Sequence, residues 1–155
     1  MRLRGRMRLE VRDGGVLTAQ RAAHNVVLRH GAELVAKLFA GVQGAGHIDT
    51  VGVGFGTETV GADAVALTPP QQVIDPAKLR AAVAPAAFAI TADAPGAIKV
   101  AVTTPFDPTA ELPGVSEAGL FAGTTLYNQV VFDPVDLHVG QDVTFYWEVD
   151  FPFDH

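Results

Sequence analysis

The sequence predicts a mainly β protein, an antiparallel β-sandwich with an N-terminal hairpin and one short amphipathic α-helix. Residues alternate with period two near both ends of the chain, and only one stretch has the 3.6-residue period of a helix. Glycine, proline and aspartate separate the apolar runs at short intervals. With 155 residues, we predict a single domain over 1–155: a basic hairpin at 1–25, a helix at 29–40 and a sandwich body at 47–155.

The N-terminal segment reads as a strand because charged residues, arginines at all positions but Glu10, alternate with apolar or small residues from Arg2 to Arg12. In Arg2 to Arg12 the arginines fall on one face and mostly apolar or small residues on the other. Asp13-Gly14-Gly15 favours a turn, and Val16 to His24 can then return as a second strand.

A helix is predicted from Arg29 to Ala40. Leu34, Val35, Leu38 and Phe39 share one stripe, and Gly41 is placed to end the helix. We expect this helix to cover one opening of the β core.

The middle of the chain is rich in glycine and proline. Ile48 to Gly56 reads as a strand whose glycines let another segment approach closely. A nucleotide-binding loop is the competing interpretation, but such a loop opens a helix and no helical period follows. Residues 61–76 are predicted to form a surface loop.

A second hairpin is predicted further along. Leu79 to Thr91 and Ala97 to Thr104 have strand-like patterns, separated by the turn signal at 93–96. A helix over Leu79 to Ala92 is the alternative, but Pro85 would cost it about 3 kcal/mol.

The last third carries three apolar runs, Val115 to Phe121, Leu126 to Phe132 and Gln141 to Phe151, with a loop expected from Asp133 to Gly140. The final run alternates apolar and polar residues as a half-buried strand does. The residues that we expect to anchor the core are Phe121, Phe132, Phe145, Trp147 and Phe151.

Composition narrows the class of protein. The chain has no cysteine, no apolar run long enough to cross a bilayer and no apolar segment after its first arginines that would suit a secretion signal. We therefore expect a soluble protein synthesised in the cytoplasm, without disulfides.

Charge is divided unevenly along the chain. Residues 1–37 hold eight cationic and three acidic side chains, a formal +5, whereas the remainder holds three and fourteen, a formal −11. This division favours contacts between subunits. Nucleic-acid binding is the competing interpretation, and the lack of aromatic residues before Phe39 speaks against it. The candidate assembly interface comprises Arg2, Arg4, Arg6, Arg8 and Arg12.

No set of residues suggests catalysis, a metal or a cofactor. The histidines lack metal-ligand spacing, and Asp133, Asp136 and Asp142 are too sparse for a calcium loop. Ser116 beside Glu117 lacks the glycine pattern of a nucleophile elbow. An enzyme of unrecognised type is therefore the weakest of the functional hypotheses.

Several segments resemble small structural proteins of tailed phages and of phage-tail-like contractile particles. The resemblance is carried by four short segments, Val51 to Thr57, Val115 to Phe121, Leu126 to Pro134 and Val143 to Val149. It implies a particle subunit, in a baseplate, fibre anchor, collar or decoration, within a virion or a related extracellular or cytoplasmic particle. It also implies contacts with other particle proteins and a homo-oligomer.

The particle interpretation and its alternative each make an expectation about structure. If the first strand is an exposed edge that docks on a neighbour, removal of Met1 to Arg12 should leave a folded domain that no longer assembles. The alternative function is a carbohydrate- or receptor-binding sandwich module, with Tyr127, Tyr146 and Trp147 as an aromatic platform.

Overall fold

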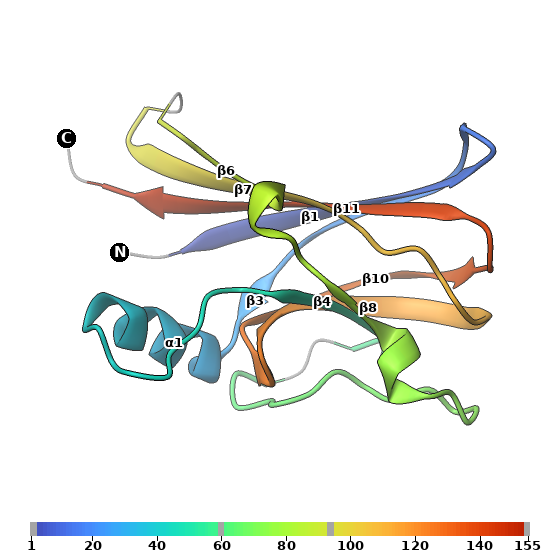
Figure 1. The fold of residues 1–155 in the computed structure, drawn as a ribbon, viewed down its shortest axis with the longest axis horizontal. Helices are drawn as coiled ribbons and strands as arrows, with labels where there is room; N and C mark the ends of the chain where they lie inside the picture. Colours follow the sequence, from blue (N-terminus) through green and yellow to red (C-terminus); the bar gives the residue numbers. More distant parts are fainter. Residues whose placement is uncertain (1–2, 59–60, 93–94, 154–155) are drawn as a thin grey trace.

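The protein folds as two antiparallel β-sheets packed face to face, with one α-helix at one end of the pair (Figure 1). The structure is a computed structural model that describes residues 3–58, 61–92 and 95–153. This architecture confirms the predicted fold class. No helix in the described segments is long and apolar enough to span a bilayer.

The first sheet contains five strands, and the N-terminal and C-terminal strands lie side by side within it. Its strand order is β2 (Val16–His24), β1 (Arg4–Asp13), β11 (Asp142–Pro152), β7 (Ala97–Pro105) and β6 (Phe88–Thr91). β1 pairs with β11 over nine residues, from Arg4 opposite Asp150 to Arg12 opposite Asp142. The first and last segments of the sequence therefore form the middle of one sheet.

The second sheet is built mainly from the last third of the chain. Its order is β3 (Val26–Val27), β10 (Asn128–Leu137), β8 (Leu112–Ala122), β4 (Thr50–Gly54) and β5 (Arg80–Ala82), and β9 (Thr125–Leu126) also pairs with β8. β10 continues through Asp133 and Pro134, where we expected a loop. Proline is tolerated there because the pairing with β8 shifts register between Val131 and Val135.

The predicted N-terminal hairpin forms, but β1 is not a free edge. β1 lies between β2 and β11, and its residues Met7, Leu9 and Val11 are buried in the core. The expectation that residues 1–12 could be removed without unfolding the domain is therefore wrong. Their removal would delete a central strand and three core side chains.

Both open sides of the sandwich are crossed by segments that change sheet. On one side β2 leads through Asn25 directly into β3 of the other sheet. On the other side β5 pairs with β4, the chain passes through a 3₁₀ turn at Pro85–Ala87, and β6 then pairs with β7. The segment predicted as one strand from Leu79 to Thr91 is thus two short strands in different sheets, because Pro85 starts a turn between them.

The helix α1 (Arg29–Phe39) ends one residue earlier than predicted, and Gly41 terminates it as expected. Gly41 adopts φ +68°, and the Val42 N–H donates to the Lys37 carbonyl at 3.0 Å, the pattern of a Schellman motif. Leu34 is buried, but Leu38 is half exposed and Phe39 is 95% exposed. Phe39, which belongs to the predicted apolar stripe, therefore does not pack on the core.

One apolar core fills the space between the sheets. Phe145 and Trp147 on β11 are fully buried and stacked with ring centroids 6.3 Å apart, and Phe106 meets Phe145 edge-on at 6.0 Å. Phe132 is also buried, whereas Phe151 is only partly buried at the end of β11. Phe121 is buried in a separate small cluster with Leu28 and Leu126, outside the main core.

Candidate functional site

The predicted arginine stripe lies on the outer face of the five-stranded sheet. Met7, Leu9 and Val11 alternate into the core, so the intervening residues of β1 point to solvent. Of the predicted interface, Arg4, Arg6 and Arg8 are exposed and Arg12 is partly exposed, while Arg2 lies outside the described residues. The structure therefore gathers the arginines on one face, as the sequence suggested.

Arg6 and Arg8 contact acidic or aromatic side chains of β11, and Arg12 contacts Glu10 of its own strand. Arg6 forms an ion pair with Glu148, and Lys99 of β7 reaches the same carboxylate at 3.7 Å. Such pairs hold the side chains in defined positions, although pairs this exposed add little to stability. The cross-strand partners are Arg4 with Asp150, Arg6 with Glu148, Arg8 with Tyr146 and Arg12 with Asp142.

A second group of contacts continues along β1. The Arg8 guanidinium lies 4.2 Å from the centroid of the Tyr146 ring, which is close enough for a cation–π interaction. Glu10 accepts a hydrogen bond from the Tyr146 hydroxyl at 3.4 Å and lies within 3.8 Å of Arg8 and 3.4 Å of Arg12. Arginine and tyrosine side chains are thus held in place across two strands.

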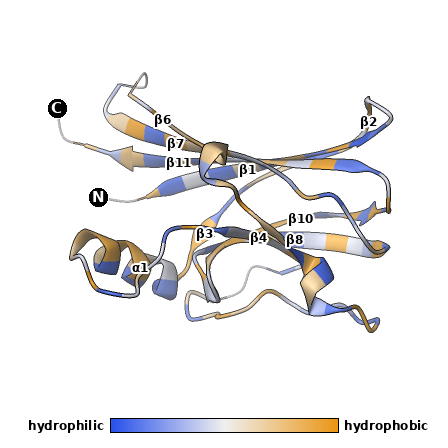
Figure 2. Ribbon diagram, in the orientation of Figure 1, coloured by the Kyte–Doolittle hydropathy of each residue, from blue (hydrophilic) through white to orange (hydrophobic). Residues whose placement is uncertain are grey.

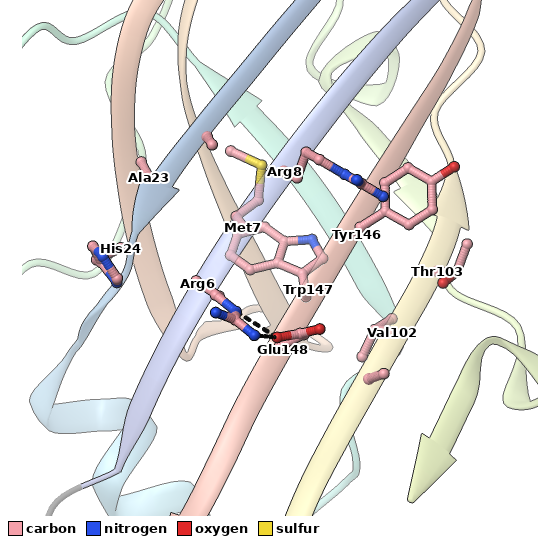
Figure 3. A pocket seen from close by; sticks show the side chains of 12 residues that line it. Arg6, Met7, Arg8, Ala23, His24, Val102, Thr103, Tyr146, Trp147 and Glu148 are labelled. Carbon is pink, nitrogen blue, oxygen red and sulfur yellow. Dashed lines mark hydrogen bonds and ion pairs between the residues drawn. The ribbon is translucent and has the colours of Figure 1, made fainter. Parts of the chain in front are cut away.

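A shallow hollow of about 580 Å³ lies over these strands (Figure 3). Arg6 and Glu148 are joined across its floor and Arg8 extends over Tyr146, as Figure 3 shows. Small side chains on the flanking strands, Ala22 on β2 and Ala101 on β7, leave the space open. The hollow is therefore a broad, open depression on a sheet face, lined by both charged and apolar side chains.

The charges of this face nearly cancel. Four arginines and Lys99 are set among Glu10, Asp142, Glu148 and Asp150. Most of the positive charge that the sequence assigned to the N-terminal segment is thus compensated by the acidic C-terminal strand. A face of this kind suits a partner with mixed charges better than it suits a polyanion.

A buried carboxylate, which sequence reasoning did not single out as a site, lies on the other sheet. Glu117 of β8 is fully buried, and its Oε1 accepts hydrogen bonds from the backbone N–H groups of Gly56 and Thr68, both at 2.8 Å. Its Oε2 accepts one from Gln129 Nε2 at 2.5 Å. The Ser116 hydroxyl donates to the Gly56 carbonyl. These contacts fasten the loop after β4 to the outer face of the six-stranded sheet.

The glycines of the same region make room for this carboxylate. A Cβ atom on Gly54 would lie 2.6 Å from Glu117 Oε1, and one on Gly119 would lie 2.6 Å from the Asn128 carbonyl oxygen. β4 and β8 pair with Gly52 opposite Gly119 and Gly54 opposite Glu117. Residues 51–57 and 115–121 are therefore neighbours in this sheet, and the glycines allow their backbones and the Glu117 side chain to pack closely.

Arg21, one of the basic residues of the N-terminal segment, links strands of the two sheets through its side-chain hydrogen bonds. Its Nε and Nη2 donate to the carbonyls of Asp133 (2.8 Å) and Pro134 (3.0 Å) on β10, and its Nη1 donates to the Gln20 carbonyl (2.8 Å). The side chain therefore bridges the edge of β2 and the edge of β10. Occupied edge carbonyls are less open to pairing with another strand, so strand addition at this point is disfavoured.

The aromatic platform of the alternative function is not assembled. Trp147 and Tyr127 are buried, and only Tyr146 is accessible on the outer face. Burial raises the pKa of the Tyr127 hydroxyl because the charged phenolate would lose its hydration. A carbohydrate-binding surface made from these three residues is therefore excluded by their positions.

Candidate metal ligands do not gather either. Within the described segments, no group of three or more histidine, aspartate or glutamate side chains is placed to hold a metal ion. Asp136 instead accepts a hydrogen bond from the Gly114 N–H at 2.8 Å, and His138 contacts Glu111 at 3.1 Å. Both serve local structure.

Comparison of the chain with protein-family models, with curated proteins and with solved structures found no match.

Proposed function

We propose that this chain is a structural subunit of a multi-protein particle of the phage-tail type and that it docks on a neighbouring protein through the outer face of its five-stranded sheet. The observation that carries the proposal is the array of arginine and tyrosine side chains held in place on that face by β11 and β7. The sequence resemblance supplies the class of particle.

Physical chemistry supports docking on this face. Arginine and tyrosine are enriched at protein–protein interfaces and among the residues that dominate binding energy. Side chains already fixed by ion pairs and stacking lose less conformational entropy when a partner binds. The sheet behind them is rigid, because β1 and β11 are its central strands and their inner faces form the core.

The charge pattern suggests the chemistry of the partner. Rows of cationic and acidic side chains alternate across β1 and β11, so a partner with complementary rows would fix both position and orientation. The same arrangement disfavours nucleic acid as the main partner, since repulsion from the acidic row opposes phosphate binding. The partner surface is therefore expected to be a protein with charges of both signs.

The test is incorporation of the chain into particles. An affinity-tagged chain is expressed in a host that assembles such particles, which are purified from the culture and examined for the chain. Substitution of both Arg6 and Arg8 by glutamine should lower incorporation at least tenfold, while thermal unfolding changes little because exposed ion pairs contribute about 0–1 kcal/mol. The matched control is Lys78→Glu, which changes the charge of a residue packed near the other sheet. Normal incorporation of the double variant would contradict the assignment of the face.

A further inference from the structure

One end of the molecule leaves an apolar surface uncovered. Helix α1 starts against the sandwich, where Gly31 is so close to Tyr127 that a Cβ atom would lie 2.1 Å from its carbonyl oxygen. The helix then runs away from the six-stranded sheet, below the end of the five-stranded sheet, and its far end carries hydrophobic residues (Figure 2). Exposure rises along the helix from Leu34 (7%) to Leu38 (44%) and Phe39 (95%).

An apolar cleft lies between this helix and the overhanging end of the sheet. Its volume is about 150 Å³. α1 contributes Leu34, Val35 and Leu38 to one wall, and strands β6, β7 and β11 form the opposite wall. The residues from these strands are Phe88, Val100, Val102, Val149 and Phe151.

The cleft has the size and chemistry to take one aromatic ring. A protein cavity of about 150 Å³ lined by leucine, isoleucine and phenylalanine stays dry and binds benzene. A phenyl ring therefore has a suitable volume and polarity to occupy the cleft. Its transfer from water is favourable, because both the ring and the cleft walls are apolar.

The chain carries such a ring directly beside the cleft. Leu38 lines the cleft and Phe39, the next residue of α1, is almost completely exposed. Ile90, which is 73% exposed, faces Val100 across the β6–β7 pairing and extends the apolar rim. An exposed apolar patch with a projecting ring beside an apolar cleft marks an interaction surface.

We propose that two copies of this chain associate through this end, each inserting the Phe39 ring into the α1 cleft of the other. A two-fold contact requires that the inserted group and its receptor lie on one continuous patch, and adjacent residues Leu38 and Phe39 satisfy that requirement. The surface differs from the arginine face, so the proposal stands or falls separately from the proposed function.

The oligomeric state tests the proposal directly. Sedimentation velocity of the purified chain from about 1 µM to 1 mM should show a reversible monomer–dimer equilibrium. Phe39→Asp should raise the dimer dissociation constant at least tenfold, because a carboxylate cannot enter an apolar cleft without a large desolvation cost. Phe39 is 95% exposed, so thermal unfolding of the monomer should change only slightly, through the acidic side chain placed at the C-terminus of the helix. Val73→Asp, at a fully exposed apolar residue in a loop, is the matched control and should leave the dimer intact.

A photo-crosslink locates the ring. A benzophenone amino acid at position 39 of the purified chain should crosslink to cleft residues of a second copy, among them Val100 and Phe151. A purely monomeric chain, a dimer that survives Phe39→Asp, or crosslinks outside the cleft would each overturn the proposal. Crosslinking in cell lysate to a different protein, with the purified chain monomeric, would also overturn it. The Arg6 and Arg8 glutamine variant should dimerise normally, which separates this test from that of the docking face.

Discussion

Replacement of Glu117 by alanine should destabilise the protein by removing a carboxylate that three donors share. In the folded protein the N–H groups of Gly56 and Thr68 and the Gln129 amide all donate to it. Leaving a buried donor without a partner costs about 1–3 kcal/mol. Thr68 is an exposed residue, so in the variant water can satisfy its N–H, and the Gly56 N–H and the Gln129 amide account for most of the loss. Part of this loss is offset, because the variant no longer buries a charged group away from water. We expect a net loss of about 2–4 kcal/mol in the free energy of unfolding.

Urea denaturation at neutral pH measures this loss. With a slope of about 1–3 kcal/mol/M, the midpoint should fall by about 1–2 M. Hydrogen exchange supplies a local readout, because the Gly56 amide should lose protection in the variant. Glu117→Gln keeps one acceptor oxygen and should cost less. The matched control, Glu58→Ala, removes an exposed carboxylate from the same loop and should stay within about 0.5 kcal/mol of the parent protein. If Glu117→Ala behaves like this control and Gly56 stays protected, the buried carboxylate does not hold the loop as argued.

Three further outcomes are expected. Arg21→Met should lower the free energy of unfolding by about 1–3 kcal/mol and speed aggregation on mild heating, because three carbonyls at the strand edges lose their hydrogen-bond donor. Arg4→Met, on the exposed face, is the control and should do neither. Equal aggregation rates of the two variants would contradict the role of Arg21 at the strand edge. Gly119→Ala should lower the free energy of unfolding by more than 1 kcal/mol, since the added Cβ would lie 2.6 Å from a backbone carbonyl oxygen. In Gly61→Ala the added Cβ meets open space, so this control should unfold at nearly the temperature of the parent protein; equal melting temperatures of the two variants would contradict the close approach at Gly119. In a Tyr146→Phe background Tyr127 is the sole tyrosine, and ultraviolet titration should show its phenolate forming only above about pH 10. Because its pKa is raised in the folded state, its contribution to stability is complete below about pH 10 and is lost as the pH rises further; ionisation at the ordinary pH would contradict its burial.

Local patterns in the sequence were reliable where one physical requirement acted alone. Alternation along β11 predicted the burial of Phe145 and Trp147, because a strand with one face in the core must alternate. Gly41 predicted the helix end, because few other residues adopt positive φ there. Patterns failed where partners distant in sequence decided the outcome. The apolar stripe on α1 placed Phe39 beside Leu34 and Leu38, but in the structure Leu34 is buried and Phe39 is exposed at the end of the helix.

In the candidate site, too, the sequence predicted features within one strand but not the contacts between strands. The sequence placed the arginines on one face of a strand, but it could not show that β11 would lie beside β1 and match them with Tyr146, Glu148 and Asp150. Similarly, Glu117 is one carboxylate among many in the sequence, and its burial follows from glycines on a strand more than fifty residues away.

The amino-acid sequence by itself determined the strands of the N-terminal hairpin, the final strand β11, the glycine that ends the helix, and the side of these strands that faces the core, because these depend on neighbouring residues and on the two-residue period of a strand. Only the tertiary structure decided that the first strand is central, that its arginines meet acidic partners, that Arg21 closes an edge and that Phe39 stands uncovered beside a cleft. Those features depend on which strands become neighbours, and that choice is set by the packing of the whole core and not by any single segment.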